Sequence, residues 1–139
     1  MTKKKKEEQK KCFCPLTWFC KLFKKISKKK AAVAVVTLSG VIGKVGKFEK
    51  GLNIDNTEPL LEKAFETKNI KAVAINVNSP GGSPVQSELI YQRIKELSKE
   101  KKIPAFTFAQ DVAASGGYFL LCAGEEIYAH DGSIVGSIG

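Results

Sequence analysis

The sequence predicts an α/β domain with a mainly parallel sheet, preceded by a basic amphipathic tail. Two observations carry this prediction. Along residues 31–139, short apolar runs of strand length alternate with longer segments of helical periodicity, which is typical of β-α units joined by right-handed crossovers. Nearly all the excess positive charge lies in residues 1–30. We therefore divide the chain into a tail, residues 1–30, and a domain, residues 31–139.

The first apolar run of the domain, residues 31–43, is rich in valine, which favours a buried strand. Residues 57–67 follow with helical spacing, and Pro59 falls in the first turn, where proline is tolerated. Residues 71–77, with the sequence KAVAINV, have the length and composition of a second strand. The domain is thus predicted to begin with a strand, a helix and a second strand.

The next helix, over residues 84–99, has the clearest start in the sequence. Ser83 is a good N-cap, Pro84 takes the first helical position, and Gln86 stands three residues after the cap. Three further elements complete the alternation: a strand at 103–109, a small-residue helix from 115 to about 123, and a strand that begins at 127–129. In such folds, functional groups gather at the carboxyl ends of the strands.

The charge distribution argues against a nucleic-acid partner. The 139-residue chain has a formal net charge of +9, and its first thirty residues hold twelve lysines and two glutamates. The tail therefore contributes +10, which leaves −1 for the domain. Proteins that bind nucleic acids carry their basic residues on the folded surface, so we expect none to bind here.

Residues 17–28 of the tail are predicted to form an amphipathic helix at a membrane surface. Apolar side chains recur there at helical spacing: Trp18, Phe19, Leu22, Phe23 and Ile26. Lysines occupy the opposite arc, which favours contact with anionic lipid. The alternative is that this face packs on the domain's own core. No uncharged run reaches the roughly 20 residues of a membrane-spanning helix, so we expect peripheral attachment, after a disordered stretch at residues 1–11.

The cysteines predict neither a disulfide framework nor a zinc site. Three of the four lie in the tail, the fourth is Cys122, and the only histidine is His130. Structural zinc sites use four closely spaced cysteine and histidine ligands, and no such spacing occurs. We expect reduced thiols, no metal and no cofactor.

Two loops at predicted strand ends carry the residues of greatest chemical interest. Residues 78–82 (NSPGG) contain two glycines, which let the backbone approach a ligand and turn its N–H groups outward. Residues 111–118 (DVAASGGY) place Ser115 at a helix start between residues too small to cover it. A nucleophilic serine needs this accessibility, and the N–H of the next residue, here Gly116, commonly helps to bind an oxyanion. Taken alone, residues 78–82 could be an ordinary strand-to-helix turn, and Ser115 could simply cap the helix that follows it.

Taken together, the segments INVNSPGGSP, AQDVAASGGYFLLCAGEEIYA and GSIVGSIG resemble the signal peptide peptidase A family of Ser/Lys peptidases, SohB-like members included. The resemblance covers roughly residues 31–139 and implies a Clp/crotonase-type fold. It also implies that Ser115 is the nucleophile, with oxyanion-binding N–H groups at Gly81 and Gly116. Asp111 and Tyr118 match the flanking motif without an assigned role.

The general base is the departure from the family pattern. The resemblance implies a lysine roughly fifty residues after the serine, beyond Gly139, so we interpret the chain as truncated before it. Lys44, Lys47 and Lys50 do not match the lysine motif. His130 is predicted to be a turn residue, because alignment with the Clp proteases puts their catalytic histidine near Ile138.

The resemblance implies a membrane-associated serine peptidase that cleaves hydrophobic signal-peptide or membrane-protein fragments, as a homo-oligomer. We expect a peripheral protein on the cytoplasmic face, and inactivity of the chain as it stands. Two alternatives stay open. One is a non-catalytic scaffold or subunit-pairing module of the same fold. The other is a crotonase-like acyl-CoA enzyme, although such enzymes use no serine nucleophile at this point.

Overall fold

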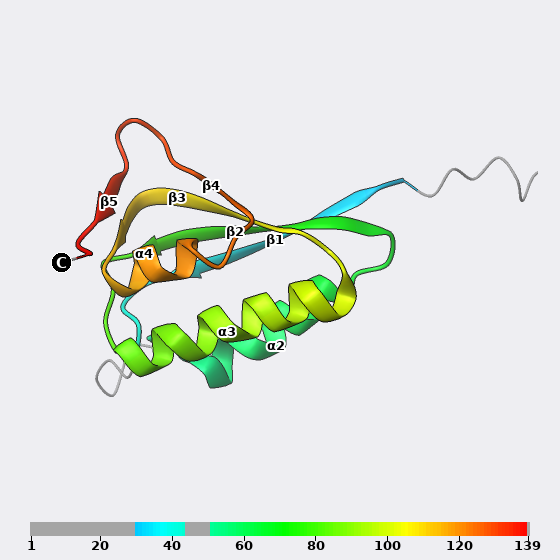
Figure 1. The fold of residues 1–139 in the computed structure, drawn as a ribbon, viewed down its shortest axis with the longest axis horizontal. Coiled ribbons are helices and arrows are strands. Elements are labelled where there is room, and N and C mark those ends of the chain that lie inside the picture. Colours follow the sequence, from blue (N-terminus) through cyan, green and yellow to red (C-terminus); the bar gives the residue numbers. More distant parts are fainter. Residues whose placement is uncertain (1–29, 44–50, 139) are drawn as a thin grey trace, which may run out of the picture. The chain divides into compact units, whose positions relative to one another are not determined.

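The computed structural model describes residues 30–43 and 51–138, in which five parallel strands form one sheet (Figure 1). The strands are β1 (Ala32–Ser39), β2 (Ile70–Ser79), β3 (Ala105–Ala114), β4 (Glu126–Tyr128) and β5 (Ile134–Gly136). Their order is β1-β2-β3-β4, and β5 pairs with the carboxyl end of β3 beyond β4. The predicted α/β class with a mainly parallel sheet is confirmed.

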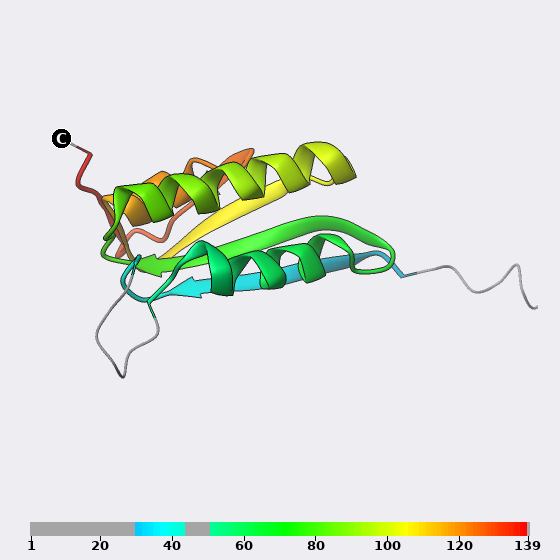
Figure 2. The same ribbon diagram turned by 90° about the horizontal axis from the view of Figure 1, so that it is seen from below.

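Three helices cover one face of this sheet: α2 (Ile54–Phe65), α3 (Pro84–Lys101) and α4 (Gly116–Leu121). Figure 2 shows α2 and α3 side by side along the strands. The core lies between the layers and includes these fully buried side chains: Leu38, Leu61, Phe65, Val73, Ile75, Ile90, Ile94, Leu120 and Leu121. The other face of β1 leaves Val33 and Val35 exposed. Within residues 30–43 and 51–138, no helix is long and apolar enough to cross a membrane.

Helix α2 begins three residues earlier than predicted, because Asn53 supplies an N-cap. The Asn53 side chain accepts from the Asn56 N–H at 3.0 Å, and the Asn56 side chain accepts from the Asn53 N–H at 3.2 Å. This reciprocal pair is a capping box built from two asparagines. Pro59 therefore lies inside the helix rather than in its first turn, where it removes one backbone hydrogen bond.

Helix α3 starts where the sequence predicts. The Ser83 side chain accepts from the Gln86 N–H at 3.5 Å, and Pro84 takes the first position. The Gln86 side chain does not complete a capping box with Ser83. Its Oε1 instead accepts from the Ile54 N–H at 2.8 Å. The start of α3 therefore also caps α2 and ties the two helices together.

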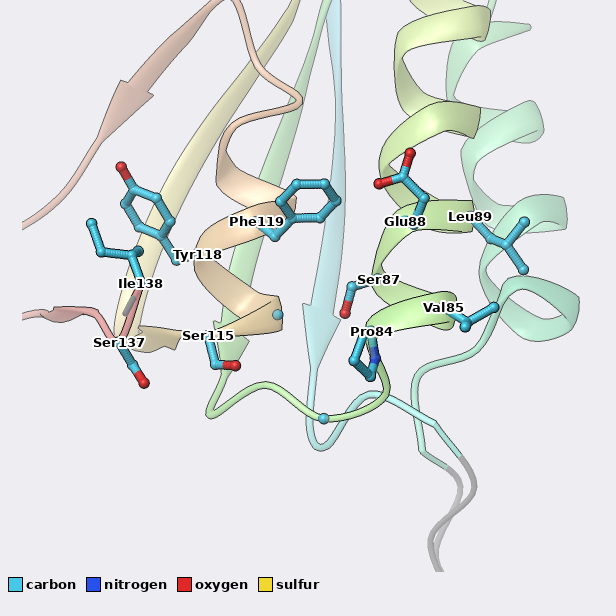
Figure 3. A pocket seen from close by; sticks show the side chains of 12 residues that line it. Pro84, Val85, Ser87, Glu88, Leu89, Ser115, Tyr118, Phe119, Ser137 and Ile138 are labelled. Atoms are coloured by element: carbon cyan, nitrogen blue, oxygen red, sulfur yellow. The ribbon is translucent and has the colours of Figure 1, made fainter.

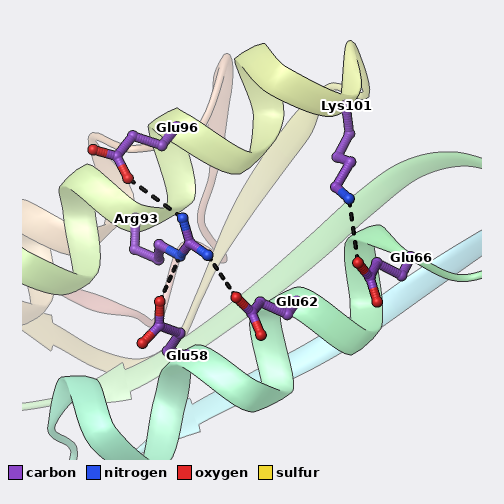
Figure 4. A network of polar contacts seen from close by, with 6 residues as sticks. All are labelled: Glu58, Glu62, Glu66, Arg93, Glu96 and Lys101. Carbon is purple, nitrogen blue, oxygen red and sulfur yellow. Dashed lines mark hydrogen bonds and ion pairs between the residues drawn. The ribbon is translucent and has the colours of Figure 1, made fainter.

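Arg93 joins α2 and α3 further along their length (Figure 4). Its guanidinium donates to Glu62 at 2.6 Å and contacts Glu96 on its own helix at 3.5 Å. Its Nε lies 2.9 Å from Glu58, although not in line for a hydrogen bond. The hydrogen bond to Glu62 is the main reason that the pKa of Arg93 is raised. One cation thus holds three carboxylates that would otherwise repel one another.

Strands β3 and β5 differ from the sequence prediction. Strand β3 was predicted to end at residue 109 but continues to Ala114, and β5 was not predicted at all. The unpredicted part of β3 pairs with β5, Val112 with Ile134 and Ala114 with Gly136. Pairing between distant segments has no local sequence signal, so periodicity alone misses it.

Candidate active site

The two predicted loops meet at the carboxyl edge of the sheet. Strand β2 ends at Ser79 and β3 ends at Ala114, on neighbouring parallel strands. A Cβ atom built on Gly81 would lie only 2.8 Å from Ser115 Cβ and 2.9 Å from Gly116 N. The loop 78–82 is therefore in direct contact with the turn that carries Ser115.

The backbone of Ser115 has an unusual conformation, with φ 53° and ψ −119°. Positive φ values are rare for residues other than glycine and cost about 1–3 kcal/mol at such positions. Two hydrogen bonds hold the turn: the Ser115 N–H donates to the Gly136 carbonyl at 2.9 Å, and the Ser115 carbonyl accepts from the Phe119 N–H at 3.0 Å. The sharp strand-to-helix turn projects the side chain outward, as in the nucleophile turns of serine hydrolases.

The side chain of Ser115 opens onto an apolar groove of about 740 Å³ (Figure 3). The residue is exposed, and its hydroxyl makes no hydrogen bond with any described residue. Apolar side chains from α3 and α4 and from the end of the described chain line the groove: Val85, Leu89, Tyr118, Phe119 and Ile138. The hydroxyl therefore borders a cavity suited to an apolar side chain.

The predicted oxyanion donor Gly81 has its N–H engaged in this structure. The N–H donates to the Ser79 Oγ at 3.1 Å, beneath the surface of the loop. Gly82, the next residue, lines the groove, whereas Gly81 does not. Among the described residues, the Gly82 N–H has no hydrogen-bond acceptor. The resemblance implies the first glycine of the pair as the donor, and the second glycine was not singled out from the sequence.

The direction of the Gly82 N–H follows from its contacts with Ile42. The Gly81 carbonyl accepts from the Ile42 N–H at 2.9 Å, and the Ser83 N–H donates to the Ile42 carbonyl at 2.8 Å. In a trans peptide the C=O and the N–H point in opposite directions, so the Gly82 N–H points away from Ile42. A Cβ atom built on Gly116 would lie 3.5 Å from the Gly82 nitrogen. The Gly82 N–H therefore lies on the side of the loop that faces the serine turn.

Gly116 provides a second unengaged N–H. It is the first residue of α4, and the described residues offer no acceptor to its N–H. A Cβ atom built on it would lie 2.4 Å from the Ser87 hydroxyl oxygen and 3.1 Å from the Ile42 side chain. The close packing of α3 against the turn therefore requires glycine here. The predicted position of Gly116 beside the serine agrees with this geometry.

Asn78 and Asp111 connect the ends of β2 and β3 just below the loops. Val77 pairs with Ala109, but the next pair is Ser79 with Ala113, so β3 bulges between them. The Asn78 side chain spans this bulge by donating to the Asp111 carboxylate at 3.0 Å and accepting from the Val112 N–H at 3.2 Å. Asp111, which had no assigned role, thus helps to shape the strand that leads into Ser115.

Of the candidate bases considered from the sequence, the structure describes His130, which does not line the groove. His130 lies in the exposed turn between β4 and β5, where its Nδ1 accepts from the Gly132 N–H at 3.0 Å. The three lysines of residues 44–50 are outside the described residues, as is the predicted tail helix. Ser137, which the sequence analysis did not single out, lines the groove with Ser115 and has φ 58°. The position of Ser137 in the GSIG motif was the sequence signal that could have indicated it.

The described segments offer no obvious place for a metal. In residues 30–43 and 51–138, no three metal-binding side chains of histidine, cysteine, aspartate or glutamate lie close enough together to hold one ion. Cys122 is half-buried and unpaired.

The fold is shared with the solved structure of a protease. The domain matches a mutant form of the 1510-N membrane-bound stomatin-specific protease with a TM-score of 0.56 and 23% sequence identity. The match covers 75% of this chain and 46% of that one. The class defined by the fold is therefore the Clp/crotonase type that the resemblance implied.

The sequence comparisons identify the family. Residues 97–139, which include Ser115 and Gly116, match the model of Peptidase family S49. Protease 4 of Haemophilus influenzae is 38% identical over 107 residues, which cover 77% of this chain and 17% of that protein. These matches confirm the family resemblance inferred from the sequence, with residues 97–139 similar to Peptidase family S49 and the wider domain similar to a protein named Protease 4.

Another relative has a different name. A Brucella melitensis protein named Na(+)/H(+) antiporter NhaA is 52% identical over 108 residues, or 77% of this chain. The match covers only 15% of that protein, so its transport function gives no guide to this chain. The chain spans about one sixth of the length of these two curated relatives.

Proposed function

We propose that this chain supplies the nucleophile and the oxyanion-binding loops of a serine peptidase, with Ser115 as the nucleophile. The observation that carries the proposal is the Ser115 turn, a strained residue whose free hydroxyl faces an apolar groove between two unengaged N–H groups. A merely structural serine gains nothing from positive φ, whereas strain of this kind persists at sites where it orients a reacting group. The family match to S49 peptidases supports the same role.

In the proposed reaction the Ser115 oxygen attacks the peptide carbonyl carbon, and a base takes its proton. The carbonyl oxygen becomes an oxyanion, which accepts hydrogen bonds from Gly116 and Gly82. Gly81, the donor expected from the resemblance, would first have to release Ser79. The tetrahedral intermediate then expels the amine, which takes up the proton, and leaves an acyl-enzyme that water hydrolyses. Losing one oxyanion donor typically costs about 3 kcal/mol of transition-state stabilisation.

The base in this scheme is a lysine that is not among the described residues of the groove, as in the Ser/Lys peptidases that the chain resembles. No lysine or histidine lines the groove among the described residues. A serine hydroxyl is a weak nucleophile without a base, and general-base catalysis typically contributes about 10²–10⁴ in rate. We therefore propose that residues 1–139 alone do not turn over substrate, and that in isolation they act at most as a scaffold of the same fold.

The proposed substrates are extended hydrophobic segments, such as signal-peptide or membrane-protein fragments. The apolar walls of the groove support this choice, because five of its side chains are hydrophobic or aromatic. The tail at residues 17–28 would bring the site to the surface of a membrane, where such segments occur. To test this attachment, Trp18 fluorescence is followed with anionic vesicles. A blue shift that salt partly reverses is expected, and no shift would refute the attachment.

The activity is tested on a form of the protein extended beyond Gly139, with a hydrophobic fluorogenic peptide as substrate. Ser115→Ala deletes one exposed hydroxyl, so the circular dichroism spectrum and melting temperature should stay close to those of the parent. Turnover should fall to background. Ser133→Ala, which alters a hydroxyl in the exposed β4–β5 turn, serves as the matched control and should keep full turnover. Turnover that survives Ser115→Ala would refute the nucleophile assignment.

A further inference from the structure

We propose that Ser79 is a positioning residue of this site, whose buried hydroxyl orients the loop so that the Gly82 N–H faces the oxyanion. The proposal rests on the proposed function, because it concerns the same intermediate. Ser79 does not line the groove and cannot touch a substrate. It acts through the backbone of the two residues that separate it from Gly82.

Among the described residues, the Ser79 hydroxyl has one hydrogen-bond partner. The residue is fully buried at the end of β2, and its Oγ accepts from the Gly81 N–H at 3.1 Å. Pro80 between them has no N–H, so Gly81 is the first residue after the strand that can be held this way. The hydrogen bond fixes the plane of the peptide that joins Pro80 to Gly81.

The next peptide plane is fixed from the opposite side. The Gly81 carbonyl accepts from the Ile42 N–H, which turns the Gly82 N–H towards the groove. Each plane is thus held by one hydrogen bond, one from Ser79 and one from Ile42. Gly81 has φ 102° and Gly82 has φ 148°, and glycine is the residue type that rotates most freely. Without the Ser79 bond the first plane can turn, and the bond from Ile42 alone must then hold the Gly82 N–H in place.

Ser79 itself cannot move to follow the loop. Its carbonyl would lie 2.5 Å from a Cβ atom built on Gly117, so α4 packs directly on its backbone. On the other side Ser79 pairs with Ala113, two residues before Ser115. The strand that carries Ser79 and the turn that carries the nucleophile therefore form one rigid unit, and the hydroxyl transmits its position to Gly82.

The test uses the 139-residue chain and an apolar peptide boronic acid, so it does not need turnover. The Ser115 oxygen bonds to the trigonal boron, the hydroxyl proton passes to the buffer, and the boron becomes a tetrahedral anion that mimics the oxyanion. Binding is followed by ¹¹B NMR and by the ¹H–¹⁵N signals of the glycine amides. The same peptide with an unreactive carboxamide in place of the boronic acid reports ordinary groove binding.

We expect the wild-type chain to form the adduct and to shift the Gly82 and Gly116 amide signals. Ser79→Ala should speed hydrogen exchange of the Gly81 amide and weaken boronate binding about tenfold, less than the loss of a whole donor. Binding of the carboxamide peptide should not change. Ser98→Ala is the matched control, because it removes a serine hydroxyl that bonds a backbone carbonyl in another part of the domain, and it should leave both ligands unaffected. Any general loss of stability would weaken both ligands alike.

The outcomes separate the two proposals. If the wild-type chain forms no Ser115 adduct, the proposed function fails and this inference fails with it. If the adduct forms and Ser79→Ala binds the boronate as tightly as wild type, only the role of Ser79 is refuted. Should Ser79→Ala not fold, Ser79→Cys keeps the shape but offers a weaker acceptor. It should show a smaller selective loss of boronate binding, and equal binding would again refute the role.

Discussion

The serine end of the sheet and the helix pair α2–α3 are held together in different ways. At the serine end, backbone meets backbone: glycines at 81, 82 and 117 lie so close to neighbouring backbone atoms that an added Cβ atom would come within 3 Å of them. Between α2 and α3, long side chains meet, with Arg93 at the centre of three carboxylates. The first arrangement leaves no room for an added atom unless the backbone moves, whereas the second can adjust by changes of side-chain rotamer.

This difference indicates that the fold tolerates few substitutions at the serine end, where the candidate site lies. Exposed ion pairs contribute little to stability, typically about 0–1 kcal/mol, and flexible side chains can re-form them after a change. A backbone contact has no such freedom, because an added atom must displace a strand or a helix. Substitutions at the serine end should therefore cost more than substitutions between the helices.

The largest effect is expected from Gly82→Ala. Its Cβ atom would lie 2.0 Å from the Ile42 carbonyl oxygen, so the loop must separate from that residue. Loss of about 3–5 kcal/mol of unfolding free energy, or failure to fold, is expected. Gly136→Ala is the matched control, because its φ of 147° is nearly the same as the 148° of Gly82 but its Cβ atom would meet nothing within 4 Å.

The control should lose only the backbone term, about 1–3 kcal/mol. Urea unfolding followed by circular dichroism measures both variants. Equal losses would show that positive φ alone makes Gly82 necessary, and the contact with Ile42 would then carry no weight in the comparison.

An intermediate effect is expected from Asn78→Ala, which removes the side chain that spans the bulge in β3. The Val112 N–H would lose its acceptor and Asp111 its donor, at a cost of about 1–3 kcal/mol. Asn76→Ala, on the same strand and the same face, is the control and should cost less than half as much. If the two variants unfold at the same urea concentration, the bulge is not held by Asn78.

The smallest effects are expected between the helices. Arg93→Ala should cost about 1 kcal/mol, since three carboxylates lose one partly exposed cation. Lys101→Ala breaks a single exposed pair with Glu66 at 3.2 Å and should change the melting temperature barely at all. A loss for Arg93→Ala as large as that for Gly82→Ala would overturn the comparison between the two regions.

The comparison also marks what the sequence can predict. Elements with local signals were found: the capped start of α3 and the strand that becomes β2 are where Ser83 and the KAVAINV run place them. The meeting of the two loops followed from parallel-strand geometry. The positions missed depend on distant partners. Strand β5 forms only because β3 continues past residue 109 to meet it.

Within the site, the sequence identified the serine turn but not which glycine of the pair offers a free N–H. That choice depends on two hydrogen bonds, from Gly81 to Ser79 and from Ile42 to Gly81. The second spans about forty residues, so no local pattern in Pro-Gly-Gly records it. The general base is predicted from the family resemblance and not from a local pattern within residues 31–139.

The most direct test of the central claim is selective labelling of Ser115 with an apolar fluorophosphonate. At alkaline pH hydroxide can take the hydroxyl proton, so labelling does not require the lysine. The serine oxygen bonds to phosphorus, and fluoride leaves. Peptide mapping by mass spectrometry should find one adduct, on Ser115, in the folded chain. Ser115→Ala and the urea-unfolded chain should show none above background. Labelling spread over several serines, or unchanged by unfolding, would contradict the account.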